Sequence, residues 1–275
     1  MKIAVFQMTS GVDPVANGNA LVAAIDEAAA HGAGMLFTPE MSGLLDRNGV
    51  RAARSVEHER NDDVLRRARG AAKAAGLWLH LGSLAVRTTD QSLWANRGFL
   101  IDPAGAIVER YDKIHLFDVD LATGESWRES ARYVRGTHIS VAETPIGRLG
   151  LGICYDVRFP ALFQALSGAG ATVIAVPAAF TVPTGEAHWH VLLRARAVEN
   201  AAFVIAAAQV GKHEDGRETY GHSLVIDPWG RVLLDMGETQ GLGYADIDPA
   251  LVDEVRARVP VIKHRRPVSE MVVAK

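Results

Sequence analysis

The stretch from Gly147 to Pro160 reads GRLGLGICYDVRFP, and it contains Cys154, the only cysteine among 275 residues. The apolar run directly before this cysteine, Leu149–Ile153, is typical of a short buried strand whose glycines allow close backbone neighbours. Pro160 suits the first turn of a helix that follows. The stretch therefore predicts that Cys154 lies where a strand gives way to a helix.

A thiol at such a turn can be chemically reactive. Peptide N–H groups gather at the start of a helix and favour a nearby anion, so the thiol is expected to tend toward the nucleophilic thiolate. A lone cysteine is also often no more than a small buried hydrophobic residue. The turn alone leaves both interpretations of Cys154 open.

Composition sets limits on the class of protein. A chain of 275 residues can bury a large core, and its hydrophobic fraction of 48% and charged fraction of 22% are those of a soluble globular protein. The net charge of −3 favours neither a nucleic acid nor an anionic membrane as partner. One cysteine excludes an internal disulfide, argues against a cysteine-based metal site and fits a reducing cytoplasm. The N-terminus lacks the pattern of a signal peptide, and no apolar run is long enough to span a bilayer.

Strand and helix patterns alternate along the first half of the chain. Strands are expected at Lys2–Met8, Met35–Thr38 and Leu77–Val86, and helices at Ala20–Ala30 and Val64–Ala75. Two Asp-Pro-x-Gly turns, beginning at residues 102 and 227, predict two similar β-hairpins. The repetition indicates two related halves, each with its own sheet.

The second half continues the alternation. Strands are expected at Ala171–Val176 and Phe203–Val210, with a helix at Gly185–Asn200. Residues 119–136 show no period and many charges, which is typical of a binding loop or lid. The tail from Val259 is expected to form an extended arm. Together these patterns predict a layered α/β domain with apolar sheets inside and helices outside.

Three segments carry a resemblance to a known family. Phe37–Glu40 (FTPE), Tyr111–Phe117 (YDKIHLF) and Gly152–Pro160 (GICYDVRFP) resemble, in order and wide separation, the signature motifs of the nitrilase superfamily of carbon–nitrogen hydrolases. Further segments are similar to its Nit branch, and one, Ala207–His213 (AAQVGKH), to the Nit1-type amidases that act on deaminated glutathione. These further segments are His188-Trp189, Arg194–Ala197, Tyr220–Ser223 and Asp227–Gly230.

The resemblance implies a fold and an assembly. It implies a four-layer α-β-β-α sandwich, formed by one carbon–nitrogen hydrolase domain at residues 1–267. It also implies pairing into an eight-layer homodimer, or a higher even-numbered oligomer. The arm at residues 259–275 is expected to pack at the interface between subunits.

The family's catalytic residues map onto this sequence by position. The Glu–Lys–Cys triad corresponds to Glu40, Lys113 and Cys154, with Cys154 as nucleophile, Glu40 as proton carrier and Lys113 as stabiliser of the oxyanion. A second glutamate, expected to orient the lysine and the water, corresponds to Glu129, and Glu125 is a weaker candidate for it. With these groups in place, catalysis is the favoured interpretation of the cysteine.

The same resemblance points to substrate-binding residues. The backbone N–H of Tyr155 is expected to share the oxyanion, and Arg158 to bind a substrate carboxylate through its planar fork. A structural ion pair is the alternative role for Arg158. Phe180 and Thr184 are expected to line the pocket, although a core phenylalanine and a loop threonine fit the sequence almost equally well.

The expected activity needs no cofactor and no metal. His188 and His190 are two residues apart, which on a helix directs their side chains away from each other, so they are not read as a metal pair. The only ligand implied is a small amide, with no nucleic acid or membrane partner.

The sequence therefore predicts a thiol amidohydrolase that forms a thioester. Deaminated glutathione is the first expected substrate. The alternatives are an ω-amidase acting on 2-oxoglutaramate or 2-oxosuccinamate and an N-carbamoyl amino acid hydrolase, with a nitrile less favoured. An alternative of another class is a catalytically silent dimeric protein that only binds.

Overall fold

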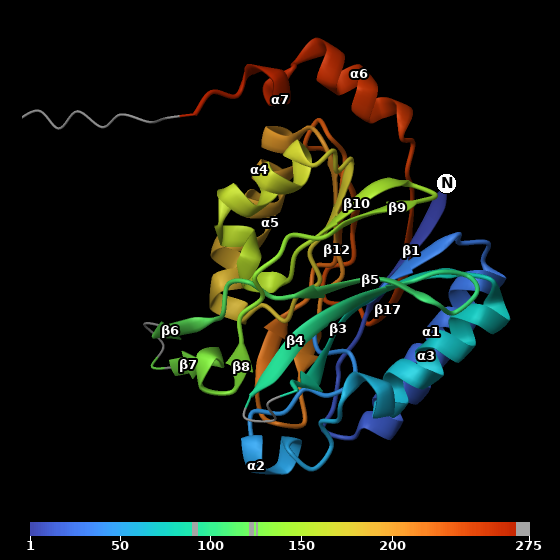
Figure 1. The fold of residues 1–275 in the computed structure, drawn as a ribbon, viewed down its shortest axis with the longest axis vertical. Helices are drawn as coiled ribbons and strands as arrows, with labels where there is room; N and C mark the ends of the chain where they lie inside the picture. Colours follow the sequence, from blue (N-terminus) through green and yellow to red (C-terminus); the bar gives the residue numbers. More distant parts are fainter. Residues whose placement is uncertain (90–92, 121–123, 125, 268–275) are drawn as a thin grey trace, which may run out of the picture.

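The computed structural model describes residues 1–89, 93–120, 124 and 126–267. Two β-sheets face each other, and a pair of helices covers the outer side of each (Figure 1). The predicted four-layer α-β-β-α sandwich is therefore confirmed. No helix in the described ranges is long and apolar enough to cross a membrane.

The first sheet contains the N-terminal strands. Its central strands β1, β2 and β3 run parallel, and β17, β4 and β5 flank them in antiparallel pairs. The order is β17 (Gly241–Asp246), β1 (Lys2–Gln7), β2 (Met35–Phe37), β3 (Trp78–Arg87), β4 (Trp94–Ile101) and β5 (Ile107–Asp112), with β8 (Tyr133–Val134) paired to β4.

Helices α1 (Pro14–Ala30) and α3 (Asp63–Ala75) cover this sheet. The side chain of Asp62 accepts a hydrogen bond from the backbone N–H of Leu65, and Gly76 ends α3 in the left-handed conformation, which fits the helix expected at Val64–Ala75. Helix α1 begins six residues before the expected start at residue 20, because Asp13 caps the helix and Pro14 fills its first turn.

The second sheet repeats this plan. Strands β10, β11 and β12 are parallel at its centre, and helices α4 (Pro160–Gly168) and α5 (Val182–Asn200) cover it. Both predicted hairpins are present, as β4–β5 and β15–β16. The order is β16 (Val232–Asp235), β15 (Leu224–Ile226), β12 (Phe203–Ala206), β11 (Val173–Ala175), β10 (Gly147–Leu151) and β9 (Val141–Thr144).

Two segments differ from expectation. The strand predicted at 203–210 is divided into β12 and β13 (Val210–Lys212), and β13 pairs with β14 (Glu218–Tyr220) outside the main sheet. Within 119–136, expected to be a loop, short strands β6 (Asp118–Asp120) and β7 (Ser126–Arg128) form a hairpin, and a 3₁₀ turn follows at Glu129–Ala131. These elements are too short to produce a recognisable sequence period.

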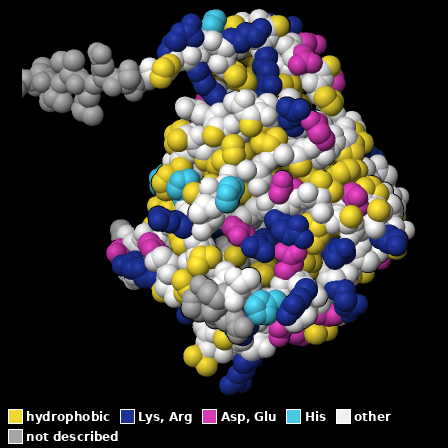
Figure 2. Space-filling view, in the orientation of Figure 1, with side chains coloured by type: hydrophobic (Ala, Val, Ile, Leu, Met, Phe, Trp, Pro, Cys, Tyr) yellow, Lys and Arg dark blue, Asp and Glu magenta, His cyan; other side chains and the backbone are white. Residues whose placement is uncertain are grey.

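The main core lies between the two sheets. Ile3, Val5 and Phe37 of the first sheet pack there with Leu149, Ile174 and Ile205 of the second, all of them buried. A second cluster lies under α1 and α3. On the face shown in Figure 2, basic and acidic side chains are interspersed, in keeping with the net charge of −3.

The chain ends with two helices outside the sandwich, α6 (Ala250–Arg258) and α7 (Val261–His264). The predicted arm is thus partly helical. Arg265 donates from its guanidinium to Gln164 O at 2.8 Å and to Asn200 Oδ1 at 2.8 Å, both in the same chain. The described part of the arm is therefore hydrogen-bonded to the middle of α4 and to the last residue of α5.

His80 on β3 is a titratable side chain inside the fold. It is fully buried, and burial lowers its pKa to about 3 because the positive charge cannot be hydrated there. Its Nδ1 has no hydrogen-bond partner in the described part of the chain. The folded protein therefore holds His80 neutral, whereas the unfolded chain binds a proton below pH ~6.5.

This difference predicts a pH-dependent loss of stability. The unfolded state binds more protons as the pH falls from about 6.5 toward 3, so stability is complete above this range and declines within it. Denaturant unfolding at pH 8 and pH 5 is the measurement. Wild type should lose about 2 kcal/mol more than His80→Leu between these values. Equal losses in the two proteins would contradict a neutral buried His80.

Candidate active site

The predicted catalytic residues follow the ends of strands in both sheets. Glu40 comes three residues after β2, Lys113 directly after β5, and Cys154 three residues after β10. Because β2 and β10 lie in opposing sheets, the sandwich brings the two loops face to face. With Glu129 these residues line a cavity of about 480 Å³. The structure thus brings together all four side chains that the sequence singled out.

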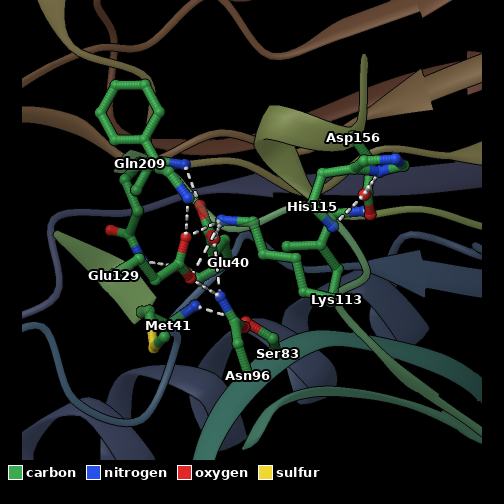
Figure 3. A network of polar contacts seen from close by, with 12 residues as sticks. Glu40, Met41, Ser83, Asn96, Lys113, His115, Glu129, Asp156 and Gln209 are labelled. Carbon is green, nitrogen blue, oxygen red and sulfur yellow. Dashed lines mark hydrogen bonds and ion pairs between the residues drawn. The ribbon is translucent and has the colours of Figure 1, made fainter. Parts of the chain in front are cut away.

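Lys113 is the centre of the site. Its side chain is 2% exposed, and its Nζ lies 2.8 Å from Glu40 Oε1 and 2.9 Å from Glu129 Oε2 (Figure 3). The second oxygen of Glu129 lies 3.2 Å from the same nitrogen. One ammonium group therefore holds two carboxylates, and charge-assisted hydrogen bonds fix all three side chains.

Asn96 on β4 completes the network and was missed by sequence reasoning. Its Nδ2 donates to Glu40 Oε1 at 2.9 Å and to Glu129 Oε1 at 3.0 Å. The backbone N–H of Ala179 donates to Glu40 Oε2 at 2.9 Å, and that of Phe117 to Glu129 Oε2 at 2.7 Å. The clue in the sequence was a polar residue within a strand that is otherwise largely apolar.

The charges of this network shift its pKa values. Burial would raise the pKa of Glu40, but Lys113 outweighs that effect and holds it below its usual value. Burial would lower the pKa of Lys113, but the charges of Glu129 and Glu40 keep it well above its usual value. At neutral pH the site therefore contains a carboxylate beside an ammonium group.

The thiol of Cys154 behaves differently from the sequence prediction. Burial, and then the negative charge of Glu40, raise its pKa well above the usual value, and the residue is only 7% exposed. The expectation of a resting thiolate is therefore wrong. Two desolvated anions side by side are unfavourable, so the resting thiol keeps its proton beside the Glu40 carboxylate.

The backbone at Cys154 is a strained turn, as expected where a strand passes into a helix. Cys154 has a φ of +50°, in the left-handed region that favours glycine, and it begins a 3₁₀ turn, Cys154–Arg158, ahead of α4. Its N–H donates to Pro177 O at 2.8 Å. The N–H of Tyr155 has no acceptor among the described residues, which leaves it available to an oxyanion.

Asp156 ties the nucleophile turn to the lysine loop. Its buried carboxylate accepts from Tyr111 Oη at 2.7 Å, from the N–H of His115 at 3.0 Å and from the N–H of Ile153 at 2.9 Å. His115 Nδ1 lies 2.7 Å from the same carboxylate (Figure 3). Lys113 and Cys154 are therefore held in register by one side chain that touches neither.

Gly82 allows the Glu40 loop to approach the sheet. A Cβ at this position would lie 2.1 Å from Thr38 O and 2.4 Å from Pro39 O, distances that no side chain tolerates. The pairing of β3 with β4 also shifts register between Leu81 and Leu84. The irregular strand thus makes room for the backbone that carries Glu40.

The substrate-binding predictions have mixed placements. Tyr155, Phe180 and Thr184 line the cavity. Arg158 is not among the described residues that line it, because its guanidinium stacks over the rings of Phe180 and Tyr155 and lies 3.2 Å from His188 Nδ1. Its role in carboxylate binding stays a prediction. Glu125, the weaker candidate for the second glutamate, lies outside the described residues.

Sequence reasoning also missed a group of basic side chains. Four arginines line the cavity, namely Arg47, Arg128, Arg132 and Arg217. Arg128 and Arg132 lie in the 119–136 stretch, whereas Arg47 and Arg217 come from segments far from it, and surface arginines carry no distinctive pattern in a sequence. Together with Lys113 they slightly outnumber the acidic side chains of the lining, which are Glu40, Asp46, Glu129 and Glu218.

One cluster outside the cavity contains metal-ligand side chains. The ligand atoms of His190, His222 and Asp235 lie within 4.8 Å of one another. Asp235 Oδ2 lies 2.9 Å from His190 Nε2, and its Oδ1 lies 2.9 Å from His222 Nδ1, so the three already pair among themselves. His188 contacts Arg158 instead, which confirms that His188 and His190 point apart.

Comparison with known proteins identifies the family. Residues 2–257 match the carbon–nitrogen hydrolase family. The chain belongs to this family. It is a hydrolase that acts on carbon–nitrogen bonds, and the resemblance to the nitrilase superfamily seen in its motifs is confirmed.

Individual relatives agree with this placement. A deaminated glutathione amidase of Yersinia enterocolitica is 41% identical over 240 residues, which cover 86% of this chain and 84% of that protein. The crystal structure of the Caenorhabditis elegans NitFhit protein matches with a TM-score of 0.89 and 40% identity, covering 96% of this chain and 65% of that one. Nit3 of Saccharomyces cerevisiae, a member of branch 10 of the nitrilase superfamily, matches with a TM-score of 0.85 and 27% identity, covering 97% and 96%.

The network makes Glu40 the candidate proton acceptor, and this role can be tested. Glu40→Gln keeps the shape of the side chain but cannot accept the thiol proton. Amide hydrolysis should fall by about 100- to 10,000-fold, measured as kcat/KM. Glu57→Gln, an exposed carboxylate outside the cavity, is the matched control and should retain full activity. Wild-type rates in Glu40→Gln would exclude this role.

Proposed function

We propose that the protein is an amidase that cleaves deaminated glutathione through a thioester on Cys154. Two facts support the proposal. The relative from Yersinia enterocolitica bears the name deaminated glutathione amidase and is 41% identical. Lys113, held between Glu40 and Glu129 at 2.8 and 2.9 Å beside a buried thiol, is the observation that carries the chemistry.

The first half of the reaction forms the thioester. Glu40 takes the proton from the Cys154 thiol as the sulfur attacks the amide carbonyl carbon. The carbonyl oxygen becomes an oxyanion, which Lys113 and the N–H of Tyr155 stabilise. When the C–N bond breaks, Glu40 passes the proton to the leaving nitrogen. The amine departs, and the acyl group stays on sulfur.

The second half releases the acid. Glu40, again a carboxylate, takes a proton from a water molecule that attacks the thioester carbon. The C–S bond breaks, and the proton returns to sulfur. Glu129 positions the Lys113 ammonium throughout, since two of its oxygen–nitrogen contacts are at 2.9 and 3.2 Å. The sum is one amide bond and one water converted to an acid and an amine.

The same machinery would serve other small amides. The ω-amides 2-oxoglutaramate and 2-oxosuccinamate, and N-carbamoyl amino acids, present the same carbonyl to the same nucleophile. A cavity of about 480 Å³ is large enough for more than the smallest of them. The intact network of charged groups favours an active enzyme over a silent binding protein, because buried charges without a task are costly.

Product analysis tests the substrate. Deaminated glutathione should yield 2-oxoglutarate without ammonia, whereas 2-oxoglutaramate should yield both. We expect faster turnover of the first, and loss of both activities in Cys154→Ala, because the acyl acceptor is then absent. Preference for 2-oxoglutaramate would reassign the protein to the ω-amidases. Failure with both amides would exclude the proposed substrate, and N-carbamoyl amino acids would be assayed next.

We also propose that residues 1–267 form one hydrolase domain that pairs through α5. Val191 and Val198 project from one side of this helix with 61% and 50% exposure, and Trp229 on the adjacent β15–β16 turn is 54% exposed. The turn packs on the helix, since Arg194 Nε donates to Gly230 O at 2.9 Å. Such an apolar face is typical of an interface. That the arm at 259–275 also packs at this interface stays a prediction.

Light scattering after size-exclusion chromatography tests the pairing. Wild type should elute as a dimer or a higher even-numbered oligomer. Val198→Glu should shift it toward the monomer, because a charge would be buried at the interface. Val15→Glu, exposed on α1 at the opposite side of the fold, is the control and should leave the assembly unchanged. A wild-type monomer would exclude the interface.

A cytoplasmic location completes the proposal. The thiol of Cys154 must stay reduced to act as a nucleophile, and the chain has no second cysteine to protect it as a disulfide. Cell fractionation tests the placement, and recovery outside the cytosolic fraction would contradict it.

A further inference from the structure

Trp127 on β7 lies against two guanidinium groups at the wall of the cavity. The Cζ atoms of Arg47 and Arg217 are each 5.0 Å from the centre of its ring. The three residues come from separate segments: the loop after Glu40, the β6–β7 hairpin and the β13–β14 hairpin. All three line the cavity, and they are called the Trp127 cluster below.

The cluster is held in place from behind. Asp215, whose side chain is fully buried, accepts from Arg217 Nε at 2.8 Å and from the backbone N–H of Arg47 at 2.8 Å. One carboxylate therefore fixes two of the three segments. The positions of Arg47 and Arg217 are therefore fixed by hydrogen bonds to a buried carboxylate.

Several hydrogen-bond donors of the cluster have no acceptor among the described residues. Neither the Nη groups of Arg217 nor the guanidinium of Arg47 donates a hydrogen bond to any residue that the structure describes. The indole N–H of Trp127 is buried and also lacks a described acceptor. Buried polar groups are nearly always paired, so the indole N–H lacks the acceptor that such a group normally has, and the free guanidinium donors of Arg47 and Arg217 lie beside it at the cavity wall.

The charges around the cluster favour an anion. Of the other arginines that line the cavity, Arg128 is paired with Asp120, whereas Arg132 makes no ion pair among the described residues. Asp46 also lines the cavity but is neutralised by Arg51 at 2.6 Å. Glu218 is an exposed acid at the same wall. The balance of unpaired groups is positive, as a carboxylate site requires.

We propose that the Trp127 cluster binds the carboxylate of the leaving amine, and this rests on the proposed amidase function. Deaminated glutathione carries a carboxylate at each end, one in the acyl part and one in the departing cysteinylglycine. Ammonia, the leaving group of 2-oxoglutaramate, carries none. The cluster is thus the element that would let this cavity prefer the larger amide.

The position of the cluster favours the leaving end over the acyl end. Cys154 is buried, whereas Arg47 is exposed and Trp127 is half-buried, so the cluster lies toward the mouth of the cavity. A dipeptide amine must depart through the mouth while the acyl group remains on sulfur. Donors beside that route contact the amine and are remote from the acyl group.

Selectivity between two substrates tests the site. Arg47→Gln removes one unpaired guanidinium from an exposed side chain, so folding should be unaffected. Arg217→Lys keeps the charge against Asp215 but loses the planar fork. In each variant kcat/KM for deaminated glutathione should fall about 10- to 100-fold. For 2-oxoglutaramate it should stay within about twofold, because its leaving group makes no contact with the cluster.

Combining a modified substrate with the variant tests whether Arg47 and the glycine carboxylate contact each other. In wild type, converting the glycine carboxylate of deaminated glutathione to an amide should cause a loss like that of Arg47→Gln, and in the variant it should cause little further loss. Arg54→Gln, an exposed arginine outside the cavity lining, is the matched control and should change neither substrate.

Two results would overturn the proposal, and they differ from each other. Equal losses on both amides in Arg47→Gln would show that the cluster binds the acyl end or only supports the wall, while the amidase function stands. No turnover of deaminated glutathione by wild type would remove the proposed substrate and, with it, the subsite.

Discussion

The site depends on one constraint, the burial of a lysine ammonium between two carboxylates. Lys113 is 2% exposed, with Glu40 and Glu129 within 2.9 Å. Removal of one partner from a buried ion pair destabilises a folded protein by about 3–5 kcal/mol. Substitution of any one of the three groups is therefore expected to disrupt the other two. The charge balance also explains the protonation states. The ammonium keeps Glu40 ionised, and burial together with the resulting negative charge keeps the proton on the resting Cys154 thiol.

Local signals in the sequence predicted a layered α/β domain, and the resemblance to the nitrilase superfamily supplied the four-layer sandwich. The apolar strands, the helical periods and the two Asp-Pro-x-Gly turns are each determined by neighbouring residues. The short strands β6, β7 and β8 escaped because two or three residues cannot show a period. Their position is determined by partners elsewhere in the chain.

The candidate catalytic residues could be located from the sequence, and much of their environment could not. Glu40, Lys113 and Cys154 stand in motifs, so a resemblance finds them. Asn96 stands in no motif and is recognised only when β4 places it against both glutamates. The resting thiolate was predicted wrongly because a helix start was considered without the carboxylate that the opposite sheet supplies. The basic wall around Trp127 likewise exists only in three dimensions.

The facing sheets have a consequence for how such an enzyme can change. In the proposed mechanism the base, Glu40, follows β2 in one sheet and the nucleophile, Cys154, follows β10 in the other, so the apolar layer between the sheets sets the distance between the two groups. Side chains such as Phe37 and Leu149 therefore act as spacers for the chemistry. Substitutions that change the volume of this layer would therefore change the reaction rate even when every polar residue of the site is kept. The catalytic rate and the core volume are expected to change together during evolution.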